Sequence, residues 1–135
     1  MDKSKFKTEP YLEKVDKPWG HELIFAPIDS SITSKILHIN EGKRLSLQYH
    51  DQKEEILSLL NGKALLTIED SQGNFEEVEM EEKKGYLIRA FQKHRIKGIT
   101  ACNILETSTG EKGITTRVED DYNRPTETES LRSKR

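Results

Sequence analysis

The sequence predicts an all-β protein, built as an antiparallel barrel or sandwich. Apolar and polar residues alternate with a period of two through much of residues 34–106, as in strands that bury one face. Turn-forming residues interrupt these runs at short intervals, which is typical of all-β folds with many short strands. No long stretch carries the 3.6-residue period of an amphipathic helix.

The composition limits the class of protein. A chain of 135 residues is long enough for one domain of ordinary size. The net charge of -2 gives no reason to expect nucleic-acid binding, and one Cys excludes an intramolecular disulfide and a multi-cysteine zinc site. No apolar run approaches the roughly 20 residues that cross a bilayer, and the N-terminus lacks the apolar core of a signal peptide. We therefore expect a cytoplasmic protein without a membrane partner.

Both ends of the chain differ from the middle. Residues 1–16 are rich in charges of both signs, and we expect an N-terminal arm that is partly ordered. Residues 17–124 hold the alternating pattern and form the predicted barrel domain. Residues 125–135 are polar and contain a single Leu. Such a segment cannot bury enough apolar surface to offset its ordering entropy, so we expect a disordered tail.

Eight strands are expected in chain order: residues 34–39, 45–50, 56–60, 64–68, 75–80, 86–90, 95–99 and 101–106. Asn61-Gly62 suits a tight hairpin turn, because both residues tolerate positive φ. Residues 71–74 mark a second turn. The acidic stretch 76–82 reads as a solvated hairpin face, and Cys102 as a small core residue.

Residues 45–50 alternate most cleanly and place Ser46, Gln48 and His50 on one face. If that face points inward, it lines a cavity of the kind in which a small barrel holds one ligand. Glu55 follows after a short turn, and His94 comes from a later strand. Two imidazoles, one carboxylate and one amide oxygen make a mixed nitrogen and oxygen site. The sequence thus predicts one divalent metal ion, with Zn, Mn, Fe, Co and Ni all compatible.

The spacing of these residues resembles two known motifs. Residues 42–62 resemble the first cupin motif, with Gln48 where that motif usually has its first His. Residues 85–94 resemble the second motif, with Phe91 in place of the usual Pro. Four segments narrow the resemblance to the type II mannose-6-phosphate isomerase family: Lys17-Pro18-Trp19-Gly20, LSLQYH at 45–50, His94-Arg95-Ile96 and RVEDDYNR at 117–124. The resemblance implies the cupin fold, a double-stranded β-helix or jelly-roll barrel.

The resemblance also implies an activity and a set of ligands. It implies Gln48, His50, Glu55 and His94 as metal ligands, and the six-residue gap to Gly62 favours Glu55 over Glu54. The implied reaction interconverts mannose 6-phosphate and fructose 6-phosphate through an enediolate. Some members carry a mannose-1-phosphate guanylyltransferase domain, and we expect the cupin domain alone here. Two departures, residues 51–53 (DQK) and Ile56-Leu57 where the family typically has His-Trp, leave the identity of the sugar open.

Several residues are candidates for handling the substrate. Glu106 shares a strand face with Cys102, and a buried carboxylate there would have a raised pKa suited to a proton-transferring base; Lys35 is the alternative. Basic residues near the metal suit a small anionic substrate such as a sugar phosphate. The substrate-binding candidates are Arg44, Arg89, Arg117 and Arg124.

Two further functions stay open at this point. The same fold can bind a metal or a sugar without catalysis. Two His and one carboxylate also resemble the facial triad of Fe(II) dioxygenases. Whatever the function, we expect a homodimer, because small cupins usually pair and the N-terminal region can add to a neighbour's sheet.

Overall fold

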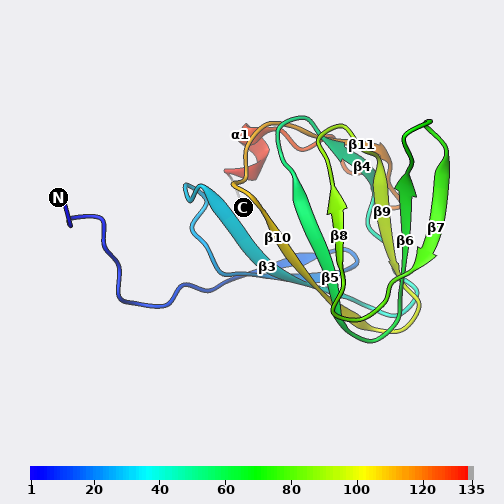
Figure 1. Cartoon of the computed structure of the whole chain (residues 1–135), viewed down its shortest axis with the longest axis horizontal. Helices are drawn as coiled ribbons and strands as arrows, with labels where there is room; N and C mark the ends of the chain where they lie inside the picture. The colour runs from blue at the N-terminus through cyan, green and yellow to red at the C-terminus, as the bar shows by residue number, and fades with distance from the viewer. Residues whose placement is uncertain (134–135) are drawn as a thin grey trace.

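Two antiparallel sheets pack against each other with the core between them (Figure 1). The computed structural model describes residues 1–133. The strands are β1 (Glu13–Lys17), β2 (Gly20–Ile24), β3 (Ile32–Ile39), β4 (Leu47–His50), β5 (Glu55–Asn61), β6 (Ala64–Glu69), β7 (Phe75–Glu79), β8 (Gly85–Ile88), β9 (His94–Gly98), β10 (Cys102–Thr109) and β11 (Thr115–Glu119). A single helical turn, α1 (Glu129–Arg132), follows them. No helix in this part of the chain is long and apolar enough to cross a membrane.

The six-stranded sheet has the order β1-β2-β3-β10-β5-β8, and the five-stranded sheet has the order β11-β4-β9-β6-β7. After the hairpins β1–β2 and β2–β3, the chain passes back and forth between the two sheets, and only β6–β7 pair as a further hairpin. This is the topology of a jelly roll. It confirms the predicted all-β barrel.

The core lies between the sheets and is built from the inward residues of each strand. Alternate residues of β3, β5 and β10 are buried, as the period-two pattern predicts. Leu37, Leu57 and Ile104 from the larger sheet meet Leu66 and Ile96 from the smaller one. Cys102 is fully buried and unpaired, and burial raises the pKa of its thiol to about 11, which confirms its expected place in the core.

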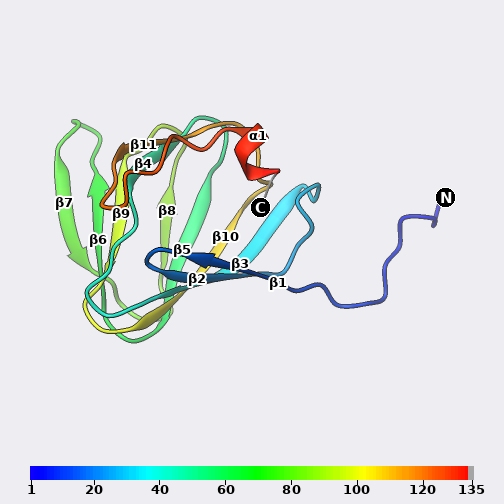
Figure 2. The same cartoon turned by 180° about the vertical axis from the view of Figure 1, so that it is seen from behind.

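The eight expected strands correspond to β3–β10, with ends displaced by up to three residues. The sequence reasoning did not foresee β1, β2 and β11. The first two form the outer end of the larger sheet (Figure 2), where only one face is covered and charged residues interrupt the alternation.

The hairpin expected at Asn61-Gly62 is wrong, although the positive φ at Gly62 is present. β5 pairs with β8 and β10, whereas β6 pairs with β7 and β9, so Gly62 lies at a corner where the chain changes sheets. The turn expected at residues 71–74 is confirmed as the β6–β7 hairpin. Asp70 Oδ1 accepts hydrogen bonds from the backbone N–H groups of Gln72 and Asn74 there.

The two ends of the chain behave differently in the structure. Residues 1–12 extend away from the barrel without joining a sheet (Figures 1 and 2). Residues 125–133, expected from their composition to be disordered, lie against the barrel. Thr115 and Glu127 exchange two backbone hydrogen bonds, of 2.9 and 2.8 Å, and the side chain of Arg132 in α1 is buried. The last two residues of the expected tail lie outside the described residues.

Candidate metal centre and ligand cavity

Three side chains from different strands converge inside the barrel. His50 ends β4, Glu55 begins β5 after a short loop, and His94 begins β9, the neighbour of β4. Glu55 Oε1 lies 2.9 Å from His94 Nε2 and 3.5 Å from His50 Nε2. All three residues are buried, and one ligand atom from each lies within 4.8 Å of the other two. The expected convergence is therefore present.

The imidazole of His94 is oriented by the backbone. Its Nδ1 lies 2.9 Å from the carbonyl oxygen of Gln92, which only accepts hydrogen bonds, so Nδ1 carries the proton. In the neutral ring Nε2 then presents a lone pair to Glu55 Oε1. Two acceptors at this distance require a cation between them, either a proton or a metal ion.

The second imidazole supplies an independent observation. His50 Nδ1 lies 2.8 Å from Thr115 Oγ1, and its buried Nε2 has no hydrogen-bond partner within residues 1–133. Burial and the nearby Lys53 ammonium lower the pKa of His50 to about 4, so the ring is neutral at pH 7. A buried ring nitrogen without a hydrogen-bond partner is costly, and a metal ion in front of it would supply that partner. The donor set thus fits a divalent metal ion.

Glu55 is kept ionised by its neighbours. Although burial alone would raise its pKa, Lys53 and the two imidazoles hold it well below the usual range. Lys53 Nζ lies 3.6 Å from Glu55 Oε2, whereas the two imidazoles face Oε1. Glu54, the alternative carboxylate, is half-buried and pairs with Arg89, whose Nη1 lies 3.3 Å from Glu54 Oε2.

Gln48 lies beside this cluster. It is the register partner of His94, and it lines the same recess as Glu55 and His94. Its Oε1 accepts a hydrogen bond of 2.7 Å from Ser46 Oγ, which fixes the orientation of the amide. The inward direction expected for Ser46, Gln48 and His50 is confirmed. Metal ligation by Gln48 stays a prediction.

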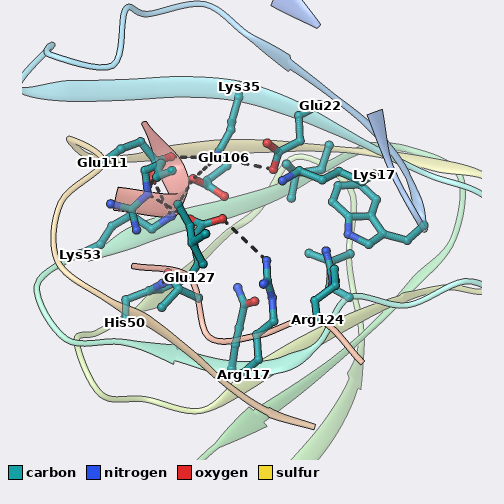
Figure 3. A pocket seen from close by; sticks show the side chains of 17 residues that line it. Lys17, Glu22, Lys35, His50, Lys53, Glu106, Glu111, Arg117, Arg124 and Glu127 are labelled. Carbon is teal, nitrogen blue, oxygen red and sulfur yellow. Dashed lines mark hydrogen bonds and ion pairs between the residues drawn. The ribbon is translucent and has the colours of Figure 1, made fainter. Parts of the chain in front are cut away.

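The cluster adjoins a cavity of about 190 Å³ (Figure 3). His50, Gln48 and Glu106 line this cavity, and the last two also line the recess that holds Glu55 and His94. The cavity wall is strongly charged. Six cationic side chains line it, Lys17, Lys35, Lys53, Arg117, Arg124 and Arg132, against four carboxylates, Glu22, Glu106, Glu111 and Glu127.

Two buried lysines and several carboxylates form a network in this wall. Lys35 Nζ lies 2.8 Å from Glu111, 3.5 Å from Glu22 and 3.8 Å from Glu106. Lys53 Nζ lies 3.3 Å from Glu106 and 3.8 Å from Glu111. The carboxylates outweigh the desolvation of Lys35 and raise its pKa well above the usual value, so its amine stays protonated.

In Glu106, by contrast, the effect of burial on the pKa exceeds that of the neighbouring lysines. Burial raises the pKa of Glu106 to about 7, against the lowering effect of Lys35 and Lys53 and with the help of Glu55 and Glu111. Its side chain also accepts a hydrogen bond of 3.4 Å from Ser108 Oγ. A carboxyl group that changes its charge near neutral pH can both take up and release a proton.

Of the four arginines predicted to bind the substrate, two line the cavity and two do not. Arg117 and Arg124 line the cavity. Arg44 instead makes a bidentate pair with Asp121, at 2.7 and 2.8 Å, and Arg89 is largely exposed. Neither of these two lines the cavity among the residues the structure places. Arg89 lies in the loop between β8 and β9, whose direction the local pattern does not determine.

Sequence reasoning missed several cavity residues. Lys53 lies inside the first motif, but at a position where this sequence departs from the family pattern. Glu111 lies in the loop after β10 and Arg132 in α1, and neither belongs to a motif. Of the other departures, Ile56 faces outward and is 45% exposed, whereas Leu57 lines the recess beside Glu55.

A jelly-roll barrel with two histidines and a glutamate converging on its inner surface is a cupin. The chain belongs to the family described as mannose-6-phosphate isomerase C-terminal, whose sequence profile matches residues 4–125. No curated protein matches the chain.

Solved structures agree on the fold. Oxalate decarboxylase from Bacillus subtilis at pH 4.6 superposes with a TM-score of 0.70 and 16% identity, over 85% of this chain and 33% of that one. The capsular polysaccharide assembling protein CapF from Staphylococcus aureus superposes with a TM-score of 0.62 and 14% identity, over 87% of this chain and 34% of that one. This chain thus spans about a third of each, and identities this low show the fold alone.

Proposed function

We propose that this protein is a metal-dependent isomerase that interconverts mannose 6-phosphate and fructose 6-phosphate. One observation carries the proposal: a buried metal-competent trio and a carboxyl group with a pKa near 7 line adjoining parts of one cationic cavity. Membership of the mannose-6-phosphate isomerase C-terminal family supports the same reaction. An aldose–ketose isomerase needs each of these parts.

His50, Glu55 and His94 would hold the metal, with Gln48 as a fourth ligand. When bound, a divalent ion supplies Lewis acidity that stabilises the negative charge developing on the sugar oxygens. The protein contributes the neutral imidazole of His50 and the ionised Glu55 that such an ion requires.

Glu106 is the better supported of the two proton-transfer candidates. Its carboxylate takes the proton from C2 of the open-chain mannose 6-phosphate and returns it to C1 of the enediolate, while the hydroxyl proton of O2 passes to O1. The carboxylate therefore ends the cycle ionised as it began. Lys35 is held as an ammonium by three carboxylates, which suits it to positioning Glu106 rather than to accepting a proton.

The cationic wall suits the phosphate of the substrate. Lys17, Arg117 and Arg124 line the cavity and provide N–H donors for phosphate oxygens.

A direct assay tests the proposal. The purified chain, supplied in turn with Mn, Zn or Co, should convert mannose 6-phosphate to fructose 6-phosphate and the reverse. Absence of turnover with all of these metals would overturn the assignment. Binding of the sugar phosphate without turnover would instead support the binding module, and oxygen uptake with Fe(II) would support a dioxygenase.

A further inference from the structure

The segment that follows the family match contributes to the cavity. The match ends at residue 125, and residues 126–133 fold back over the barrel as the bridge to β11 and the turn α1. The Thr128 hydroxyl caps α1 by accepting a hydrogen bond of 3.3 Å from the N–H of Leu131. Glu129 accepts a hydrogen bond of 2.6 Å from the N–H of Gly113. These contacts attach the segment to the loop between β10 and β11.

The side chain of Arg132 is the one charged group that α1 places in the cavity wall. It is 5% exposed. Its Nε lies 3.0 Å from Glu127 and 3.5 Å from Glu111, and its Nη2 donates to the carbonyl oxygen of Gly113 over 3.2 Å. Its buried Nη1 finds no hydrogen-bond partner in residues 1–133. A buried, charged N–H group without an acceptor is costly, so this group favours an acceptor supplied by a ligand.

Arg117, on β11, also has a buried guanidinium nitrogen without a hydrogen-bond partner in the described part of the chain. It also lines the cavity, its Nη2 lies 3.7 Å from Glu127, and its buried Nε has no partner among the residues described. Figure 3 shows the side chains of Arg117 and Glu127 pointing toward each other. Two guanidinium groups therefore share Glu127, and in each of them one buried nitrogen has no hydrogen-bond partner among the described residues.

The charges of the cavity indicate the chemistry of the missing acceptor. Six cationic groups face four carboxylates there, an excess of two positive charges when all are ionised. A phosphate monoester carries about -1.5 to -2 charge at pH 7 and three acceptor oxygens. It would neutralise this excess and accept hydrogen bonds from the guanidinium groups that line the cavity.

We propose that Arg132, together with Arg117, binds the phosphate group of the substrate, and that the C-terminal segment thereby selects phosphorylated over neutral sugars. This inference rests on the proposed function, because it assigns one end of that substrate. It goes beyond it by giving a binding role to a residue outside the family match. His50 and Glu106 line the same cavity, which leaves room beside them for the sugar carbons.

Calorimetric titration of the full chain with inorganic phosphate, mannose 6-phosphate and mannose tests the inference. We expect Arg132→Gln to weaken binding of both phosphates by about tenfold to a hundredfold, the loss of one charge-assisted hydrogen bond, and to leave mannose binding unchanged. Lys84→Gln makes the same charge change at an exposed site paired with Glu81 and should bind like the parent protein.

Glu127→Gln provides a test with the opposite sign. It removes the carboxylate that both guanidinium groups share, so phosphate binding should tighten severalfold. A phosphate bound away from these two guanidinium groups would gain little, because the repulsion by one carboxylate falls with distance. If Arg132→Gln does not fold, as judged by circular dichroism, unchanged or weaker phosphate binding by Glu127→Gln overturns the inference.

The outcomes separate this inference from the isomerase proposal. Phosphate binding that depends on Arg132 in a protein without turnover supports the inference and removes the proposed reaction. Turnover together with unchanged phosphate binding by Arg132→Gln removes the inference alone. A parent protein that binds neither phosphate contradicts both.

Discussion

His94 Nε2 lies 2.9 Å from Glu55 Oε1, while the other nitrogen of the same ring is occupied by the carbonyl of Gln92. The pair faces an unpartnered nitrogen of His50. One carboxylate oxygen and two imidazole nitrogens in one buried volume form a donor set that a cation between them would satisfy. This relationship underlies the first prediction.

Replacing either imidazole by alanine should remove the bound metal and leave the barrel folded. The metal content of His50→Ala and His94→Ala, measured by elemental analysis of purified protein, should fall to the level of a chelated sample. His38→Ala is the matched control, because His38 bonds to Asn103 outside the cluster and should leave the metal in place. Full metal content in both ligand variants would place the centre elsewhere.

Glu106→Gln should abolish proton transfer without removing the metal. We expect kcat to fall by about 10² to 10⁴, the range for loss of a general base, because the amide keeps the shape but cannot accept the proton. Metal content and KM serve as controls, since Glu106 is not a member of the trio. A variant with the parent kcat would exclude Glu106 as the base.

The raised pKa of Glu106 predicts how stability changes with pH. Burial raises it from 4.5 to about 7, so folding disfavours the ionised form. Stability that is fully present below pH 4.5 is therefore lost as pH rises through about 7. In chelated protein, Glu106→Gln should gain on the order of 2 to 3 kcal/mol over the parent between pH 5 and pH 8. Urea unfolding at the two pH values measures this difference, and a constant difference would contradict the pKa assignment.

Gly62→Ala should destabilise the fold more than Gly42→Ala. Gly62 and Gly42 both have positive φ, +82° and +75°, so an alanine at either position is strained to a similar degree. At Gly62 an added Cβ would also collide with the carbonyl oxygen of Ala101, whereas at Gly42 the space is open within 4 Å. We expect an extra loss of about 1–3 kcal/mol at Gly62, measured by denaturant unfolding. Equal losses would show that the corner between β5 and β6 can relax.

Local patterns were sufficient for eight of the eleven strands and for the direction of the metal-binding side chains. In a strand, side-chain direction follows from sequence position alone, so alternation through residues 45–50 places Gln48 and His50 on one face whatever the partner strand. The spacing to Glu55 and the later His94 completed the trio. The sequence by itself thus determined the fold class and the candidate metal centre.

The tertiary structure decided what surrounds that centre. Only long-range pairing shows that the chain changes sheets at Gly62, that Arg44 and Arg89 lie away from the cavity, and that Arg132 returns to its wall. The physical reason is that loops and chain ends take their direction from the sheets to which they attach, and a strand's sheet depends on partners far away in the sequence.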